Sequence, residues 1–158
     1  MELSPRQIAE LKGVISGCLE RLYRDDADLI SRHGVEPAVI GTFYGYVLEA
    51  VGGLEWLRGL RVDTEYNKNG LDSKRTVRKP NGIRPDIIIH RRGYNEANVL
   101  VMEIKGWSNT EPREDDIVKL EDLTNQEEEY KYGLAVFLDL GKVGCKPEYF
   151  AGGQRVDI

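Results

Sequence analysis

The sequence contains few of the residues that bind soft metals or form covalent cross-links. Among 158 residues there are two cysteines, Cys18 and Cys145, and two histidines. Without a C-x-x-C pair, two such distant cysteines indicate neither a disulfide framework nor a zinc site, and a reducing cytoplasm is the expected compartment. No apolar run approaches the roughly 18 residues of a membrane span. The N-terminus also lacks the basic and then apolar segments of a signal peptide. We therefore expect a cytoplasmic protein without a membrane partner.

An excess of basic charge is absent too. The chain has 22 Lys and Arg against 27 Asp and Glu, a net charge of -5, which argues against a general nucleic-acid coat protein. The charges are nevertheless segregated, because residues 68–92 hold eight basic against two acidic residues, and residues 111–129 hold nine acidic against two basic ones. An isolated charged run is commonly a solvated surface. A basic run beside a cluster of carboxylates would favour a functional role.

The apolar periodicity predicts a single α/β domain over residues 1–158. This length is sufficient to bury a core without disulfides or a structural metal. Apolar residues first recur at helical spacing and then at strand spacing. The expected elements are helices at 4–34 and 36–52, strands at 61–67, 83–90 and 99–105, a helix at 114–130, a strand at 133–140, and a short edge strand within 146–158. The order α-α-β-β-β-α-β predicts a mixed central sheet flanked by helices.

Four charged residues are expected to meet at one edge of this sheet. Three consecutive strands joined by loops most readily form an antiparallel meander. In a meander the ends of the first and third strands lie beside the start of the second. Glu65 ends the first strand, Asp86 begins the second, and Glu103 and Lys105 end the third.

The chemistry of this edge favours a hard metal ion. Side chains two positions apart share a face, so Glu103 and Lys105 are expected to emerge as an ion pair beside Val99 and Val101. Charge at an apolar surface is costly unless a metal or partner compensates it. Carboxylates that lie close together repel one another unless a cation separates them. A site of oxygen ligands alone favours Mg²⁺ or Mn²⁺ over zinc.

The motifs Arg84-Pro85-Asp86 and Glu103-Ile104-Lys105 resemble the signature of the PD-(D/E)xK nucleases, the restriction-endonuclease-like superfamily. The order of elements is also similar to the core of that fold, and the resemblance covers roughly residues 35–140. More narrowly, residues 63–105 resemble a group of small uncharacterised prokaryotic members.

The resemblance implies a deoxyribonuclease that hydrolyses phosphodiester bonds with Mg²⁺ or Mn²⁺. Asp86, Glu103 and the carbonyl of Ile104 would hold the metal, and Lys105 would orient the attacking water and stabilise charge on the phosphate. Glu65 would complete the metal shell or hold a second ion. In several branches of the superfamily a glutamate on the first core helix joins the site, and here Glu36 is the candidate, with Glu49 second. Gln126 and Tyr130 have the Q-x-x-x-Y spacing of one branch.

The expected partner is DNA, contacted through the basic segment beside the metal site. The residues expected to contact it are Lys68, Lys74, Arg75, Arg78, Lys79, Arg84 and, by stacking on bases, Trp107. His90 is interpreted as structural or as a phosphate contact, and Trp56 as a capping or core residue. The acidic helix would face away from DNA or bind a protein partner, and a homodimer is possible. Two alternatives stay open: a non-catalytic domain of this fold that binds a partner, and a nuclease subunit active only within a complex.

Overall fold

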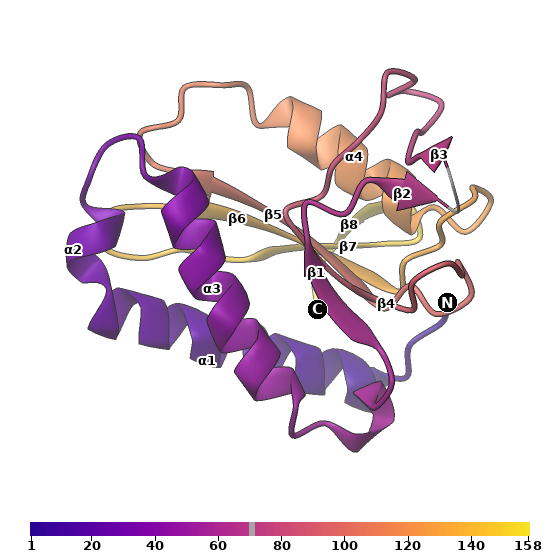
Figure 1. Cartoon of the computed structure of the whole chain (residues 1–158), viewed down its shortest axis with the longest axis horizontal. Helices are drawn as coiled ribbons and strands as arrows, with labels where there is room; N and C mark the ends of the chain where they lie inside the picture. Colours follow the sequence, from indigo (N-terminus) through magenta and orange to yellow (C-terminus); the bar gives the residue numbers. More distant parts are fainter. Residues whose placement is uncertain (70–71) are drawn as a thin grey trace.

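A mixed six-stranded sheet with helices on both faces forms the centre of the molecule (Figure 1). The computed structural model describes residues 1–69 and 72–158. The helices are α1 (Pro5–Asp25), α2 (Ala27–Ile30), α3 (Glu36–Val51) and α4 (Glu114–Thr124), and a 3-10 turn, η1 (Glu55–Leu57), follows α3. The sheet contains, in spatial order, β1 (Arg61–Thr64), β4 (Ile87–His90), β5 (Leu100–Gly106), β6 (Leu134–Leu140), β7 (Glu148–Ala151) and β8 (Gln154–Val156). A separate small pair contains β2 (Lys68–Asn69) and β3 (Asp72–Ser73).

The predicted antiparallel meander is present. β4 pairs antiparallel with both β1 and β5, and Ile87 lies opposite both Thr64 and Met102. The chain then crosses through α4 to β6, which pairs parallel with β5, as expected of a strand-helix-strand unit. The end of β1, the start of β4 and the end of β5 therefore meet at one edge.

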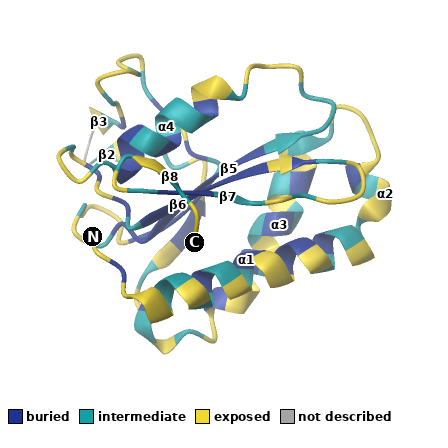
Figure 2. Ribbon diagram, turned by 180° about the vertical axis from the view of Figure 1, so that it is seen from behind, coloured by how far each residue is buried: buried dark blue, intermediate teal, exposed yellow. Residues whose placement is uncertain are grey.

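Helices α1 and α3 cover one face of the sheet. Ser4 caps α1 in a capping box with Gln7, and the apolar stripes of both helices pack on the sheet residues that face them. Figure 2 shows the outer side of α1 exposed and the strands buried beneath it. The first helix ends at Asp25, so its expected extension to residue 34 is wrong. Its apolar stripe stops at Leu22, and the polar residues that follow cannot continue the buried face.

Helix α4 covers the opposite face. Leu120 and Leu123 are fully buried against Val101 and Phe137. This helix ends at Thr124 instead of residue 130, because the chain turns back there and Tyr132 donates its backbone N–H to the carbonyl of Leu123.

Strand β5 alternates as predicted over most of its length. Leu100, Met102 and Ile104 pack towards α1 and α3, while Val101 packs towards α4. The placement of Val99 beside Val101 was wrong, because Val99 precedes the strand and packs with the α1 and α3 core.

Two further strand predictions change at their ends. The strand expected from residue 83 begins at Ile87, since the preceding Pro85 has no N–H for the ladder. The expected C-terminal edge strand is a pair, β7 and β8. Within residues 1–69 and 72–158, no helix combines the length and the apolarity that crossing a membrane requires.

Candidate functional site

Two carboxylates lie together where β4 begins and β5 ends. Asp86 Oδ2 accepts a hydrogen bond from the backbone N–H of Ile104 at 2.7 Å. Burial raises the pKa of Asp86 to about 6, although the Ile104 N–H opposes this change. Glu103 is only 3% exposed, and its burial, followed by the negative charge of Asp86, raises its pKa well above the usual value. The meander therefore brings these two acids together as predicted.

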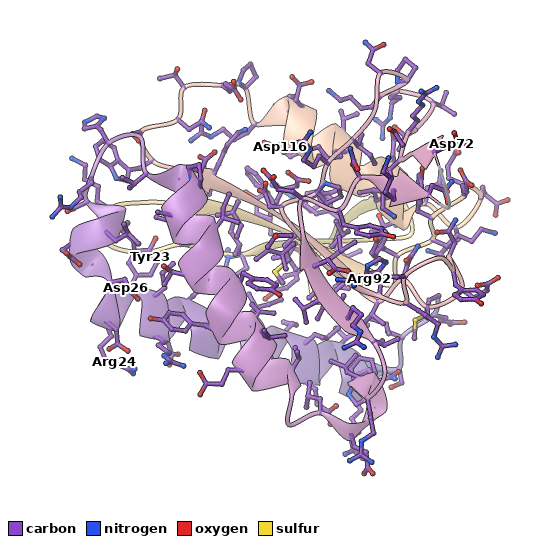
Figure 3. All side chains as sticks on the ribbon, in the orientation of Figure 1. Tyr23, Arg24, Asp26, Asp72, Arg92 and Asp116 are labelled. Carbon is purple, nitrogen blue, oxygen red and sulfur yellow. The ribbon has the colours of Figure 1, made fainter. Side chains whose placement is uncertain are left out.

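Helix α4 contributes two residues that the sequence interpretation did not include. Lys119 Nζ lies 2.8 Å from Glu103 Oε2 and 3.1 Å from Asp116 Oδ1. Lys105 Nζ lies 2.9 Å from Asp116 Oδ2 and 3.4 Å from Glu111 Oε2. The expected Glu103–Lys105 ion pair is therefore wrong, because each residue pairs with a group delivered from outside β5. Asp116 is labelled in Figure 3.

A sequence signal for these residues existed. Asp116 precedes Leu120 and Leu123 by four and seven positions, so it continues the buried stripe of α4 with a charged residue. A buried acid at such a position needs a partner. Burial acts to lower the pKa of Lys119, but the charge of Glu103 and its hydrogen bond outweigh it and the pKa is raised. Lys105 behaves in the same way beside Asp116, so both lysines stay protonated.

Glu36 reaches the same end of β5 from the first residue of α3. Its Oε2 accepts hydrogen bonds from the backbone N–H of Gly106 at 2.7 Å and from Asn109 Nδ2 at 3.0 Å. The second choice, Glu49, pairs instead with Arg21 on an exposed helix surface.

Glu65 is placed differently. Its backbone N–H donates to the carbonyl of Asp86 at 3.1 Å, so the chain passes beside the site. The side chain is 68% exposed, and Arg84 Nη1 lies 3.8 Å from its Oε2. The structure therefore brings the backbone of Glu65, but not its carboxylate, into the buried cluster.

The basic and acidic segments of the chain pack against each other. Arg78 contacts Glu121 and Asp122, and Lys79 contacts Asp115, all on α4. The acidic helix was expected to face away from DNA or to bind a protein partner, and its pairing with the basic segment of its own chain was not predicted. Opposite charges on two elements that cover the same sheet face attract, and each neutralises the other.

The remaining expected DNA contacts divide into buried and exposed residues. Lys74 is 1% exposed, and its ammonium lies 4.9 to 5.8 Å from the ring centres of three tyrosines: Tyr66, Tyr130 and Tyr132. Burial lowers the pKa of Lys74 to about 8. Lys68, Arg75 and Arg84 stay exposed.

Both tryptophans have hydrogen-bond partners within the fold. Trp107 Nε1 donates to the carbonyl of Ile30 at 2.7 Å, and Lys142 lies 4.0 Å from the centre of its ring. Trp56 Nε1 donates to Glu10 Oε2 at 2.7 Å. The ring of Trp107 is therefore already covered in part by a cation.

The Q-x-x-x-Y pair lies in the loop after α4 and makes structural contacts. Gln126 donates to the carbonyl oxygens of Thr124 and Tyr132. The hydroxyl of Tyr130 accepts the backbone N–H of Arg75 at 2.8 Å.

A second buried polar group lies further along the same sheet face. His90 Nε2 is 2.8 Å from Asp63 Oδ2, and Arg92 also contacts Asp63. In Figure 3 Arg92 lies well apart from Asp116. Asp63 lies within β1 and is buried, because the sheet is covered on both faces. This pairing supports the structural interpretation of His90.

The donor set at the carboxylates fits a Mg²⁺-like cation. Among the described residues, Glu103 Oε1 is buried without a hydrogen-bond partner. The Ile104 carbonyl points to the same strand edge as its N–H, which meets Asp86. Mg²⁺ commonly takes one or two carboxylates and keeps several waters. Within residues 1–69 and 72–158, no group of three or more His, Cys, Asp or Glu is gathered for a metal ion, so the set consists of two carboxylates and a carbonyl.

Comparison with known proteins adds no relative. No family model matches the chain, and no match was found among curated proteins or solved structures. The fold and site define a mixed α/β protein with a buried carboxylate and lysine cluster at one edge of its sheet. Inferences about its function therefore depend on the chemistry of that cluster.

Proposed function

We propose that this protein is a Mg²⁺- or Mn²⁺-dependent deoxyribonuclease with a restriction-endonuclease-like core. The observation that carries the proposal is the meeting of Asp86 and Glu103, whose free oxygen Oε1 is buried, beside Lys105. The buried Glu103 beside the partly buried Asp86 is unfavourable unless positive charge compensates the pair. A divalent metal would polarise the scissile phosphate and lower the pKa of a water bound to it.

The residues of the chain divide the remaining work. Asp86, Glu103 and the Ile104 carbonyl would hold the cation. Lys105, held by Asp116, would stabilise charge that grows on the phosphate oxygens. Glu36 fixes the turn after β5 through Gly106 and so positions Lys105. Of the expected DNA contacts, Lys68, Arg75 and Arg84 are exposed to meet phosphates.

Cleavage of DNA tests the proposal. Purified protein is incubated with plasmid and with single-stranded DNA in Mn²⁺ or Mg²⁺. The wild type should cleave, and Lys105→Ala should lose about 100-fold or more, as expected when one preorganised charge is removed from a transition state. Lys146→Ala, an exposed lysine elsewhere, should cleave like the wild type. If neither the wild type nor Lys105→Ala cleaves DNA, the proposed deoxyribonuclease activity is rejected.

One observation favours a second candidate, a non-catalytic domain or a subunit active only in a complex. The site cations Lys105 and Lys119 are paired internally, and so are Arg78 and Lys79. A scaffold with an idle site should show no Mn²⁺ binding that Asp86→Ala abolishes. Salt-dependent DNA binding without cleavage would favour the complex-dependent subunit.

A further inference from the structure

Lys119 is a cation that contacts Glu103, the buried member of the carboxylate pair. Its side chain is 16% exposed and its ammonium lies 2.8 Å from Glu103 Oε2. The second contact of the same ammonium, 3.1 Å, is to Asp116 Oδ1 one helical turn away. The helix therefore aims Lys119 at Glu103 and holds it there by a neighbouring acid.

The contacts form an alternating row of charges. Lys105 contacts Asp116, Asp116 contacts Lys119, and Lys119 contacts Glu103. Asp86 is a further acid beside Glu103, and its negative charge raises the pKa of Glu103. The Lys119 ammonium thus contacts Glu103 directly and opposes the rise in the pKa of Asp86 only through its charge, while Glu103 Oε1 stays unpartnered among the described residues. A lysine ammonium is a compact point charge that can shift between acceptors by rotating a flexible side chain.

We propose that Lys119 is an internal counter-cation that occupies the cation position at Glu103 and competes there with a divalent metal. Binding of the metal moves the ammonium from Glu103 while Asp116 retains it. This inference rests on the proposed function, since it concerns the same carboxylates. It adds a regulatory property: the site holds its acids together without metal, and metal affinity is set by the strength of the Lys119 contact.

Mn²⁺ titration by calorimetry tests the competition, with variants chosen to separate contact from charge. Lys119→Met removes the competitor and should bind Mn²⁺ about tenfold more tightly than the wild type. Lys105→Met removes the same charge from the row. The wild-type Lys105 pairs with Glu111 and Asp116 instead of Glu103. It should change Mn²⁺ affinity less than about threefold. An equal gain in both variants would assign the effect to long-range charge and overturn the proposal.

The outcomes also separate this inference from the nuclease proposal. If the wild type and Lys119→Met bind Mn²⁺ equally, the competition is rejected and the metal site stands. If neither binds, both fail. If Lys119→Met binds more weakly, Lys119 supports the metal instead of competing with it, and the inference is again rejected.

A measurement on the wild type covers the case in which Lys119→Met does not fold. Amine-reactive labelling followed by mass spectrometry reports the accessibility of each lysine. Addition of Mn²⁺ should raise labelling of Lys119 at least severalfold and leave the exposed Lys146 unchanged. No change at Lys119 in the presence of Mn²⁺ would contradict its displacement.

Discussion

The properties of individual residues in this protein depend on which charge faces which. Glu103 and Lys105 were correctly predicted to share a strand face, because strand alternation requires it. Their partners were not predicted, since Asp116 and Lys119 come from a helix that follows β5 and its connecting loop. Sequence spacing describes neighbours along one element and gives no distance between two elements.

Lys74 provides a prediction at this scale. Its pKa is lowered to about 8 because the ammonium is buried among tyrosines. Below pH 8 both the folded and unfolded states hold this proton, so the folded state bears the full cost of the buried charge. Above pH 8 the folded state releases the proton first, so the free energy of unfolding rises with pH until the unfolded lysine titrates near 10.4.

Urea unfolding of the wild type and Lys74→Met at pH 7 and pH 9.5 measures this contribution. Between these values the wild type should gain about 2 kcal/mol relative to Lys74→Met. The comparison cancels titration of the tyrosines, and Lys146→Met serves as a control with an exposed lysine. A difference that does not vary with pH would show that Lys74 does not titrate in this range.

At the scale of elements, α4 both covers the sheet and holds the loop of the basic segment that contains Arg78 and Lys79. Thr76 donates to Asp122 Oδ2 at 2.5 Å, and Arg78 contacts Asp122 and Glu121. The existence of the helix was predictable from its buried leucines. Its role as the acidic partner of the loop was not, because a charged run has the same sequence pattern whether water or another segment solvates it.

Removal of these acids should release the loop. In Asp122→Asn/Glu121→Gln the hydrogen bonds of Arg78 lose their charge-assisted partners, a loss on the order of 1.5–3 kcal/mol. Trypsin should then cut after Arg75 or Arg78 about tenfold faster, because cleavage follows the population of the open loop. Glu127→Gln/Glu128→Gln makes the same change in net charge in the next loop. If both doubles are cut at the same rate, Asp122 and Glu121 do not hold the loop.

For the whole molecule, the net charge of -5 describes a surface whose opposite runs neutralise each other. Two of the six basic residues expected to bind DNA, Arg78 and Lys79, are paired with α4, and Lys74 is buried. Three exposed cations remain: Lys68, Arg75 and Arg84. Charge counting along the chain therefore overstates the attraction for nucleic acid.

The dependence of DNA binding on salt measures this difference. Three phosphate contacts predict a slope of log affinity against log salt of about -2 to -3, whereas all six residues would give about -4 to -5. Fluorescence anisotropy with a labelled oligonucleotide gives the slope. Lys68→Gln/Arg75→Gln/Arg84→Gln should remove most of it. A slope near -5 in the wild type would mean that the loop opens on binding.

Local patterns in the chain were enough to predict the order of the main helices and central strands, the meander, and the meeting of Asp86 with Glu103, but not α2, the β2–β3 pair or the division of the C-terminal strand into β7 and β8. Apolar periodicity and short connections dictate these features because they act over a few residues. The ends of α1 and α4, the burial of Asp63, and the contacts of Lys105 and Lys119 depended on packing between distant segments. Coulombic pairing in a buried site acts across elements, and the separation between elements exists only once the chain has folded.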